Sequence, residues 1–138
     1  MSHPVHPMVV HFPIACWSLG TLGDLVSIIY PDKLVYLFSG IMLVIGTLVA
    51  IAAMITGLIE YGKIKEEDQA MSVANKHMKF VMVAWSFYAS SLFMRLEGTN
   101  LALPDTVDIL LSIAGFISLS IAGWLGGKLV YEHRIGIS

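Results

Sequence analysis

Four long apolar segments dominate this sequence, and three short polar stretches separate them. They comprise about residues 8–30, 34–61, 72–94 and 106–131. Each is long enough to supply the roughly 20 residues that a helix needs to cross the hydrocarbon core of a bilayer. The third is the weakest, because Lys76, His77 and Lys79 occupy its first turns and would have to snorkel to the interface. We therefore expect four membrane-spanning helices.

The composition is typical of an integral membrane protein. Of 138 residues, 57% are hydrophobic and only 13% are charged, whereas soluble domains carry about 25% charged residues. A soluble fold of this length could not bury so much apolar surface. The net charge of −2 and the lack of a basic stripe argue against nucleic acid as a partner. We expect an all-α fold, an antiparallel four-helix transmembrane bundle forming one domain over residues 1–138, with the lipid bilayer as its partner.

The N-terminal region narrows the class further. Residues 1–7 contain no Lys or Arg, so the charged region of a cleaved signal peptide is missing, and we expect the first helix to remain as an anchor. Cys16 is the only cysteine, which rules out an intrachain disulfide. Because the Cys-x-x-Cys-His motif is absent, any haem would be bound non-covalently, as haem b.

Positive charge is distributed unevenly between the two sides of the predicted bundle. The side that holds both termini receives Lys63, Lys65, Lys76, Lys79, Lys128 and Arg134. The opposite side, which holds the tight turn at Pro31, receives only Lys33 and Arg95. Cytoplasmic loops carry the excess of Lys and Arg, so we expect both termini to be cytoplasmic.

All five histidines fall on this cytoplasmic side. His6 and His11 open the first helix, His77 lies in the first turns of the third, and His133 follows the fourth. Ionisable residues within a membrane are costly and usually functional, and neutral imidazole is a common ligand of metals and haem iron. We expect His11, His77 and His133 to be ligands, His6 to be a further candidate, and His3 to be an interfacial bystander.

Small residues lie near three of these imidazoles. Seven residues make nearly two helical turns, so residues spaced by seven share a face. By that spacing Ser18 follows His11, Ala84 and Ser91 follow His77, and Gly126 precedes His133. Such residues leave room for a flat porphyrin, which makes Gly126 a candidate haem contact. They also allow close packing, either within the bundle or in a homodimer.

Two kinds of metal site fit these imidazoles. Histidines on separate helices suit bis-histidine haem, and they also suit a non-haem ion if Glu60 or Glu132 joins them. No metal-binding motif of fixed spacing decides between the two. Four cations on the same side could pair with haem propionates, although membrane topology alone explains their placement: Lys76, Lys79, Lys128 and Arg134.

Asp24 is an acid inside the first apolar segment, toward the side opposite the histidines. We expect it to be capped or to snorkel near Lys33, and we assign it no function.

The chain resembles a family of small bacterial four-helix membrane proteins known as domain of unknown function 2231. The matching stretches are His-Pro-Met-Val-Val-His-Phe-Pro-Ile at residues 6–14, Thr-Gly-Leu-Ile-Glu-Tyr at 56–61, Asn-Lys-His at 75–77 and Trp-Leu-Gly-Gly-Lys-Leu-Val-Tyr-Glu-His at 124–133. The family usually has Gly after the last His, where this chain has Arg134, so the backbone geometry there is open. The resemblance implies a bacterial inner-membrane protein and haem binding of the b-type cytochrome kind, through His6, His11, His77 and His133.

Together these features predict a b-type cytochrome with one or two haem b groups and bis-histidine ligation, which favours electron transfer over oxygen binding. A membrane quinone or a cytoplasmic redox protein is the expected partner. His6 and His11 lie about 140° apart around a helix, so each could serve a different haem. Pairing His11 with His77 and His6 with His133 is one of three arrangements. A non-haem metal-binding or transport protein and a structural accessory subunit are the alternatives.

Overall fold

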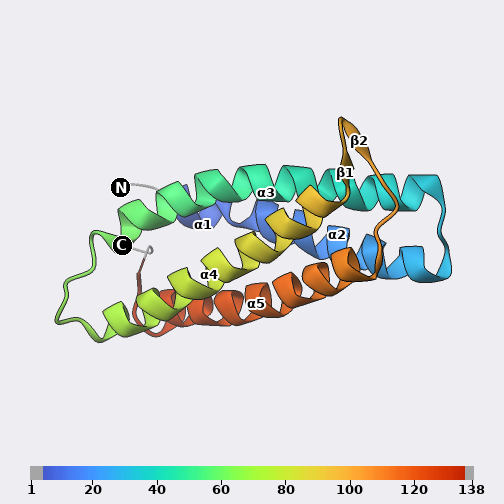
Figure 1. Ribbon diagram of the computed structural model, residues 1–138. Coiled ribbons are helices and arrows are strands. Elements are labelled where there is room, and N and C mark those ends of the chain that lie inside the picture. The colour runs from blue at the N-terminus through green and yellow to red at the C-terminus, as the bar shows by residue number, and fades with distance from the viewer. Residues whose placement is uncertain (1–4, 136–138) are drawn as a thin grey trace.

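The computed structural model describes residues 5–135, and it is almost entirely helical (Figure 1). Its elements are α1 (Val5–Val9), α2 (His11–Ile29), α3 (Lys33–Tyr61), α4 (Gln69–Met94), β1 (Leu96–Glu97), β2 (Asn100–Leu101) and α5 (Thr106–Tyr131). α1 and α2 follow one another along one path, so the chain forms an antiparallel bundle of four long helical rods. The all-α, four-helix architecture is therefore confirmed.

The first rod is interrupted at Val10, between α1 and α2. Pro13 has no backbone N–H, so the carbonyl of Val9 loses the helical bond that it would otherwise accept. The N–H of Val10 still donates to the carbonyl of His6 at 3.1 Å, and the N–H of Ile14 donates to Val10 at 3.3 Å. The rod thus continues in one direction through a small irregularity.

The other helices begin at aspartates that cap them. Asp32 accepts a hydrogen bond from the N–H of Leu34 at the start of α3, and Asp68 does the same for Ala70 at the start of α4. Asp105 forms a reciprocal capping box with Asp108 at the start of α5. Such local signals explain why the predicted segment boundaries agree with the structure to within a few residues.

The connection after α4 contains a small hairpin in place of the loop expected there. Leu96 pairs with Leu101 and Glu97 with Asn100, and Gly98 takes the left-handed φ of +65° that closes the turn. The side chain of Leu101 folds back onto α3, where a Cβ added to Gly40 would lie 2.7 Å from its Cδ1. The hairpin therefore packs against the side of the bundle.

Three described helical stretches are long and apolar enough to cross a membrane: Val5–Ile29, Lys33–Tyr61 and Thr106–Tyr131. α4 is not among them, as the charges at Lys76 and Lys79 lead one to expect. It packs mainly against α5 and runs beside it, as α2 does beside α3 (Figure 1). The molecule is thus a four-helix membrane bundle with three strongly apolar spans.

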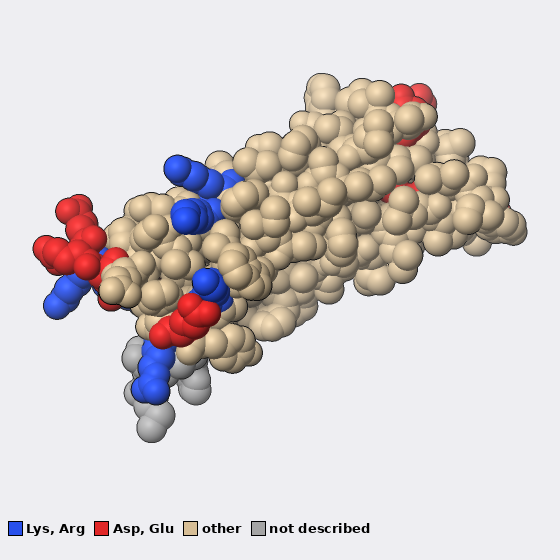
Figure 2. Space-filling view, turned by 90° about the horizontal axis from the view of Figure 1, so that it is seen from below, with Lys and Arg blue, Asp and Glu red and all other residues tan. Residues whose placement is uncertain are grey.

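The surface of the bundle fits a lipid environment. On the face shown in Figure 2, charged side chains gather at the two ends and leave an uncharged stretch between them. Large apolar side chains point outward along the helices, such as Phe93, which is 78% exposed. In a bilayer this exterior contacts hydrocarbon.

Aromatic stacking joins the α2–α3 pair to the α4–α5 pair in the centre of the bundle. The rings of Trp17 on α2 and Tyr88 on α4 lie 4.7 Å apart and nearly parallel. Leu43 on α3 and Leu119 on α5 belong to the same buried cluster. Every long helix therefore contributes to one core.

Candidate functional site

His6 lies in α1, and its side chain packs against α3 and forms hydrogen bonds with it. Its Nδ1 lies 2.9 Å from the carbonyl oxygen of Ala53 and 3.2 Å from Oγ1 of Thr56. A carbonyl only accepts hydrogen bonds, so Nδ1 carries the ring proton and donates it to Ala53. The ring lies over Gly57, where an added Cβ would come within 2.9 Å of Cε1 of His6.

His77 on α4 is held in the same way by α5. Its Nδ1 lies 2.8 Å from the carbonyl oxygen of Ala122, and a Cβ added to Gly126 would lie 3.2 Å from its Cε1. Both histidines thus contact an Ala and a Gly spaced four residues apart on the neighbouring helix. A helical carbonyl points along the axis toward the residue four positions later, so a glycine there opens the carbonyl to the imidazole.

This geometry fixes the chemical state of the two rings. When Nδ1–H donates to a backbone carbonyl, Nε2 keeps its lone pair and becomes the nitrogen that can bind a metal. Among the described residues, neither Nε2 forms a hydrogen bond. His6 and His77 therefore each present an oriented Nε2 that has no hydrogen-bond partner within residues 5–135.

We call the contacts of His6 with Ala53 and Gly57, and of His77 with Ala122 and Gly126, the two imidazole clasps. Both lie at the same end of the bundle. His6 is near enough to both His77 and Glu60 to interact with them electrostatically. Glu60 also forms an ion pair with Lys63, with 2.8 Å between Oε1 and Nζ. Within residues 5–135, no group of three or more His, Cys, Asp or Glu side chains is placed to hold a metal ion. The imidazoles of the site thus come as a pair and not as a larger cluster.

The structure places the other predicted ligands differently. His11 is the first residue of α2, and its side chain is exposed on the outside of the bundle. His133 is half-buried in the turn that follows α5. His3 lies outside the described residues. The two imidazoles that are hydrogen-bonded to a neighbouring helix belong to His6 and His77, whereas the sequence left the pairing of the histidines open.

The structure places the predicted small residues in different surroundings. Gly126 contacts the ring of His77 itself, so it positions that imidazole. Ala84 and Ser91 are fully buried, and Ser91 belongs to a polar cluster at the far end of α4. Ser18 donates a hydrogen bond to the carbonyl of Ile14 in its own helix.

The cations proposed as propionate partners lie at the same end as the clasps. Lys76 and Lys79 are exposed on α4. Lys128 lies over the ring of Trp124, at 4.7 Å from its centroid, and 3.8 Å from a carboxylate oxygen of Glu132. Arg134 is exposed and is the one non-glycine residue with positive φ among those described, at 54°. Its backbone thus lies in the left-handed region.

The most heavily buried charges lie at the opposite end of the bundle. Asp24 on α2 and Arg95, the C-cap of α4, are 0% and 1% exposed, and two hydrogen bonds of 2.8 Å join their side chains. The prediction that Asp24 snorkels near Lys33 is wrong, because its carboxylate turns inward to the guanidinium. A buried pair of this kind gives each charge the partner that a membrane interior otherwise denies it.

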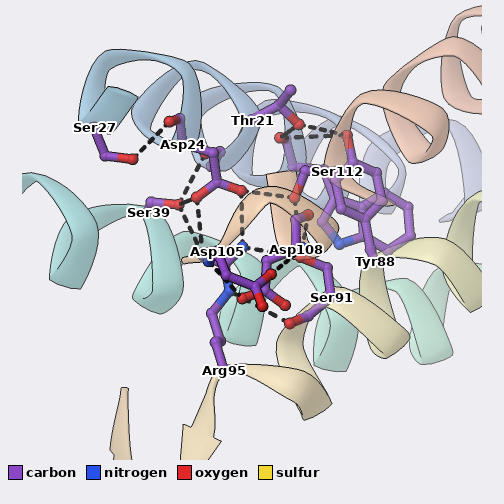
Figure 3. A network of polar contacts seen from close by, with 12 residues as sticks. Thr21, Asp24, Ser27, Ser39, Tyr88, Ser91, Arg95, Asp105, Asp108 and Ser112 are labelled. Atoms are coloured by element: carbon purple, nitrogen blue, oxygen red, sulfur yellow. Dashed lines mark hydrogen bonds and ion pairs between the residues drawn. The ribbon is translucent and has the colours of Figure 1, made fainter. Parts of the chain in front are cut away.

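Three serines complete the shell around this ion pair, as Figure 3 shows. Ser39 on α3 and Ser112 on α5 donate to the two oxygens of Asp24, and Ser91 on α4 accepts a bond of 2.9 Å from Arg95. Ser91 and Ser112 also contact each other at 3.1 Å. All four long helices therefore contribute to one buried polar cluster, which we call the Asp24–Arg95 cluster.

The sequence held a signal for this cluster. Asp24 is an ionisable residue in an apolar segment, and the principle that made the histidines candidates applies to it equally. Its partner could not be named, because Arg95 is 71 residues away in the sequence, at the end of the third predicted helix.

Comparison with known proteins gives one finding. The family described as "Predicted membrane protein (DUF2231)" matches residues 2–138. No curated protein and no solved structure gives a match.

Proposed function

Because the chain belongs to the DUF2231 family of predicted membrane proteins, we propose that it is a small b-type cytochrome in which His6 and His77 ligate a haem iron. The observation that carries the proposal is the matched pair of clasps. Each orients an imidazole through Nδ1 and leaves Nε2 without a partner among the described residues. In metal sites, a backbone carbonyl that accepts a hydrogen bond from the other ring nitrogen orients the bound histidine in this manner.

The number of ligands favours haem over a non-haem ion. Structural and catalytic non-haem sites use three or four protein ligands as a rule. A porphyrin supplies four nitrogens itself and needs only axial ligands from the protein. A pair of imidazoles on α1 and α4 suits this division, and it agrees with the lack of larger donor clusters among residues 5–135.

The chemistry of the site follows from the ligand set. Haem would supply a one-electron couple, and ligation by both imidazoles would favour electron transfer over oxygen binding. The carbonyl of Ala53 would keep the His6 ring in one orientation, and the carbonyl of Ala122 would do the same for His77. Lys76, Lys79, Lys128 and Arg134 are available at this end to pair with propionates.

The proposal extends to location and partners. The end that carries the clasps also carries most of the Lys and Arg residues, which favours its placement on the cytoplasmic side of a bacterial inner membrane. A membrane quinone or a cytoplasmic redox protein would then exchange electrons with the haem. A second haem held by His11 and His133 remains a prediction, as does a homodimer.

Absorption spectra of protein purified from haem-replete cells test the proposal. We expect a Soret band and a sharp α-band on reduction, with both lost in His6→Ala and His77→Ala. His11→Ala is the matched control for this haem: its ring is exposed, and the bands of the haem held by His6 and His77 should remain. Colourless wild-type protein without iron would overturn the proposal, and metal without porphyrin would support the non-haem alternative. Loss of half of the haem in His11→Ala and His133→Ala would support a second haem.

A further inference from the structure

Asp108 is a buried carboxylic acid beside the Asp24–Arg95 cluster. It lies in the first turn of α5 and is 4% exposed. Its Oδ2 accepts a hydrogen bond of 3.0 Å from the N–H of Asp105, as part of the capping box. Its Oδ1 is buried and has no hydrogen-bond partner among the described residues. One oxygen of this carboxyl group is therefore hydrogen-bonded, and the other is buried without a hydrogen bond among residues 5–135.

The neighbouring donors are already engaged elsewhere. Both terminal nitrogens of Arg95 donate hydrogen bonds to Asp24. They also donate to the hydroxyl groups of Ser39 and Ser91. The hydroxyl of Ser91 lies 3.0 Å from the backbone carbonyl of Asp108, and not against its side chain. Asp24, by contrast, accepts bonds on both of its oxygens.

The charges around Asp108 do not balance if all groups are ionised. The charged groups that face it are Arg95 at the end of α4, Asp24 on α2 and Asp105 at its own helix start. Arg95 remains cationic in proteins and is neutralised by Asp24. The N-terminus of α5 favours a negative charge, but exposed Asp105 already supplies one there. An ionised Asp108 would be a second acid with no cation of its own.

We propose that Asp108 is a proton-binding site, which holds one proton at Oδ1 beside the ionised Asp24–Arg95 pair. Proton uptake forms an O–H bond from the Oδ1 lone pair and changes the charge of Asp108 from −1 to 0, with no electron transferred. The proton exchanges with the side of the membrane that faces the β1–β2 hairpin, because Asp108 lies one turn from exposed Asp105 at that end. This site is at the opposite end of the bundle from the imidazole clasps.

Infrared difference spectroscopy of the wild-type protein in lipid tests the proposal directly. Exposed aspartates lose their proton at about pH 4, so at neutral pH they contribute no carbonyl band of a protonated acid. We expect such a band from one acid at neutral pH, shifted by ¹³C-aspartate labelling and by transfer to D₂O. If the band is missing, or does not shift in D₂O while the protein is folded, the proposal is overturned without any variant.

Matched variants then assign the band. Asp108→Asn should remove it, and Asp105→Asn, which changes the exposed member of the same capping box, should keep it. Circular dichroism and the intrinsic tryptophan fluorescence report whether each variant is folded. A band that persists in folded Asp108→Asn but disappears in Asp24→Asn would place the proton on Asp24 and refute the assignment to Asp108.

Discussion

At the residue scale, the ion pair between Asp24 and Arg95 makes the strongest demand on the fold. Asp24→Asn would leave a guanidinium that is 1% exposed without a counter-charge. Removing one partner of a buried pair typically destabilises a protein by about 3 kcal/mol or more. We expect a loss of that size in the free energy of unfolding, measured by denaturant unfolding in detergent.

A second aspartate supplies the control for this change. Asp32→Asn alters an N-cap at which Asn serves as well as Asp, so its effect should stay within about 0.5 kcal/mol. Replacing both charges, as Asp24→Leu with Arg95→Met, should recover part of the loss, since no unpaired charge remains. Equal effects of Asp24→Asn and Asp32→Asn would show that the buried pair contributes little.

Replacing Arg134 should stabilise the protein, whereas replacing Asp24 should destabilise it. Its φ of 54° lies in the left-handed region, which costs a side-chain-bearing residue about 1 kcal/mol relative to glycine. Arg134→Gly should therefore stabilise the closure of α5, where the N–H of Ile135 donates to Leu129 at 2.8 Å. Slower hydrogen exchange of that N–H measures the gain. Glu132→Gly, at an ordinary φ of −91°, should speed the exchange instead.

At the scale of the helices, the two clasps depend on glycines that let an imidazole reach a helical carbonyl. Gly57→Ala would place a Cβ 2.9 Å from Cε1 of His6, and Gly126→Ala would place one 3.2 Å from Cε1 of His77. Both should weaken the Nδ1 hydrogen bonds, with the larger effect at His6. Imidazole ¹⁵N chemical shifts, which distinguish the two tautomers, measure this without any bound cofactor.

Gly123 provides the control on the same helix as Gly126. An added Cβ there meets nothing within 4 Å, so Gly123→Ala should gain about 1 kcal/mol of helix propensity and leave both imidazole spectra unchanged. If Gly57→Ala and Gly126→Ala behave like Gly123→Ala, the glycines do not position the histidines.

Prediction from the sequence succeeded where the information is local. Pro31 and the capping aspartates define helix ends through their nearest neighbours, and the observed boundaries follow them. It did not decide between His6 and His11, because that choice depends on packing. His6 contacts α3, whereas His11 is exposed at the start of α2. The hydrogen-bonded carbonyl of Ala53 lies 47 residues away from His6.

At the scale of the whole molecule, the buried ion pair sharpens the charge asymmetry between the two ends. Arg95 is bound by Asp24 and no longer counts as a loop cation. Among residues 5–135, the end with the β1–β2 hairpin then keeps one exposed Lys or Arg, Lys33. The end with His6 and His77 keeps half-buried Lys128 and five exposed ones: Lys63, Lys65, Lys76, Lys79 and Arg134. The positive-inside rule therefore favours a cytoplasmic clasp end more strongly than the sequence count did.

Cysteine accessibility tests this orientation, because Cys16 is the only native thiol and can be removed as Cys16→Ser. In that background, Thr99→Cys in the hairpin turn should react with a membrane-impermeant thiol reagent added to intact cells. Glu66→Cys, in the loop between α3 and α4, should react only after the cells are opened. The reverse pattern would place the imidazole clasps outside the cytoplasm. A cytoplasmic redox partner would then be excluded, and the Asp108 carboxyl would exchange its proton with the cytoplasm instead.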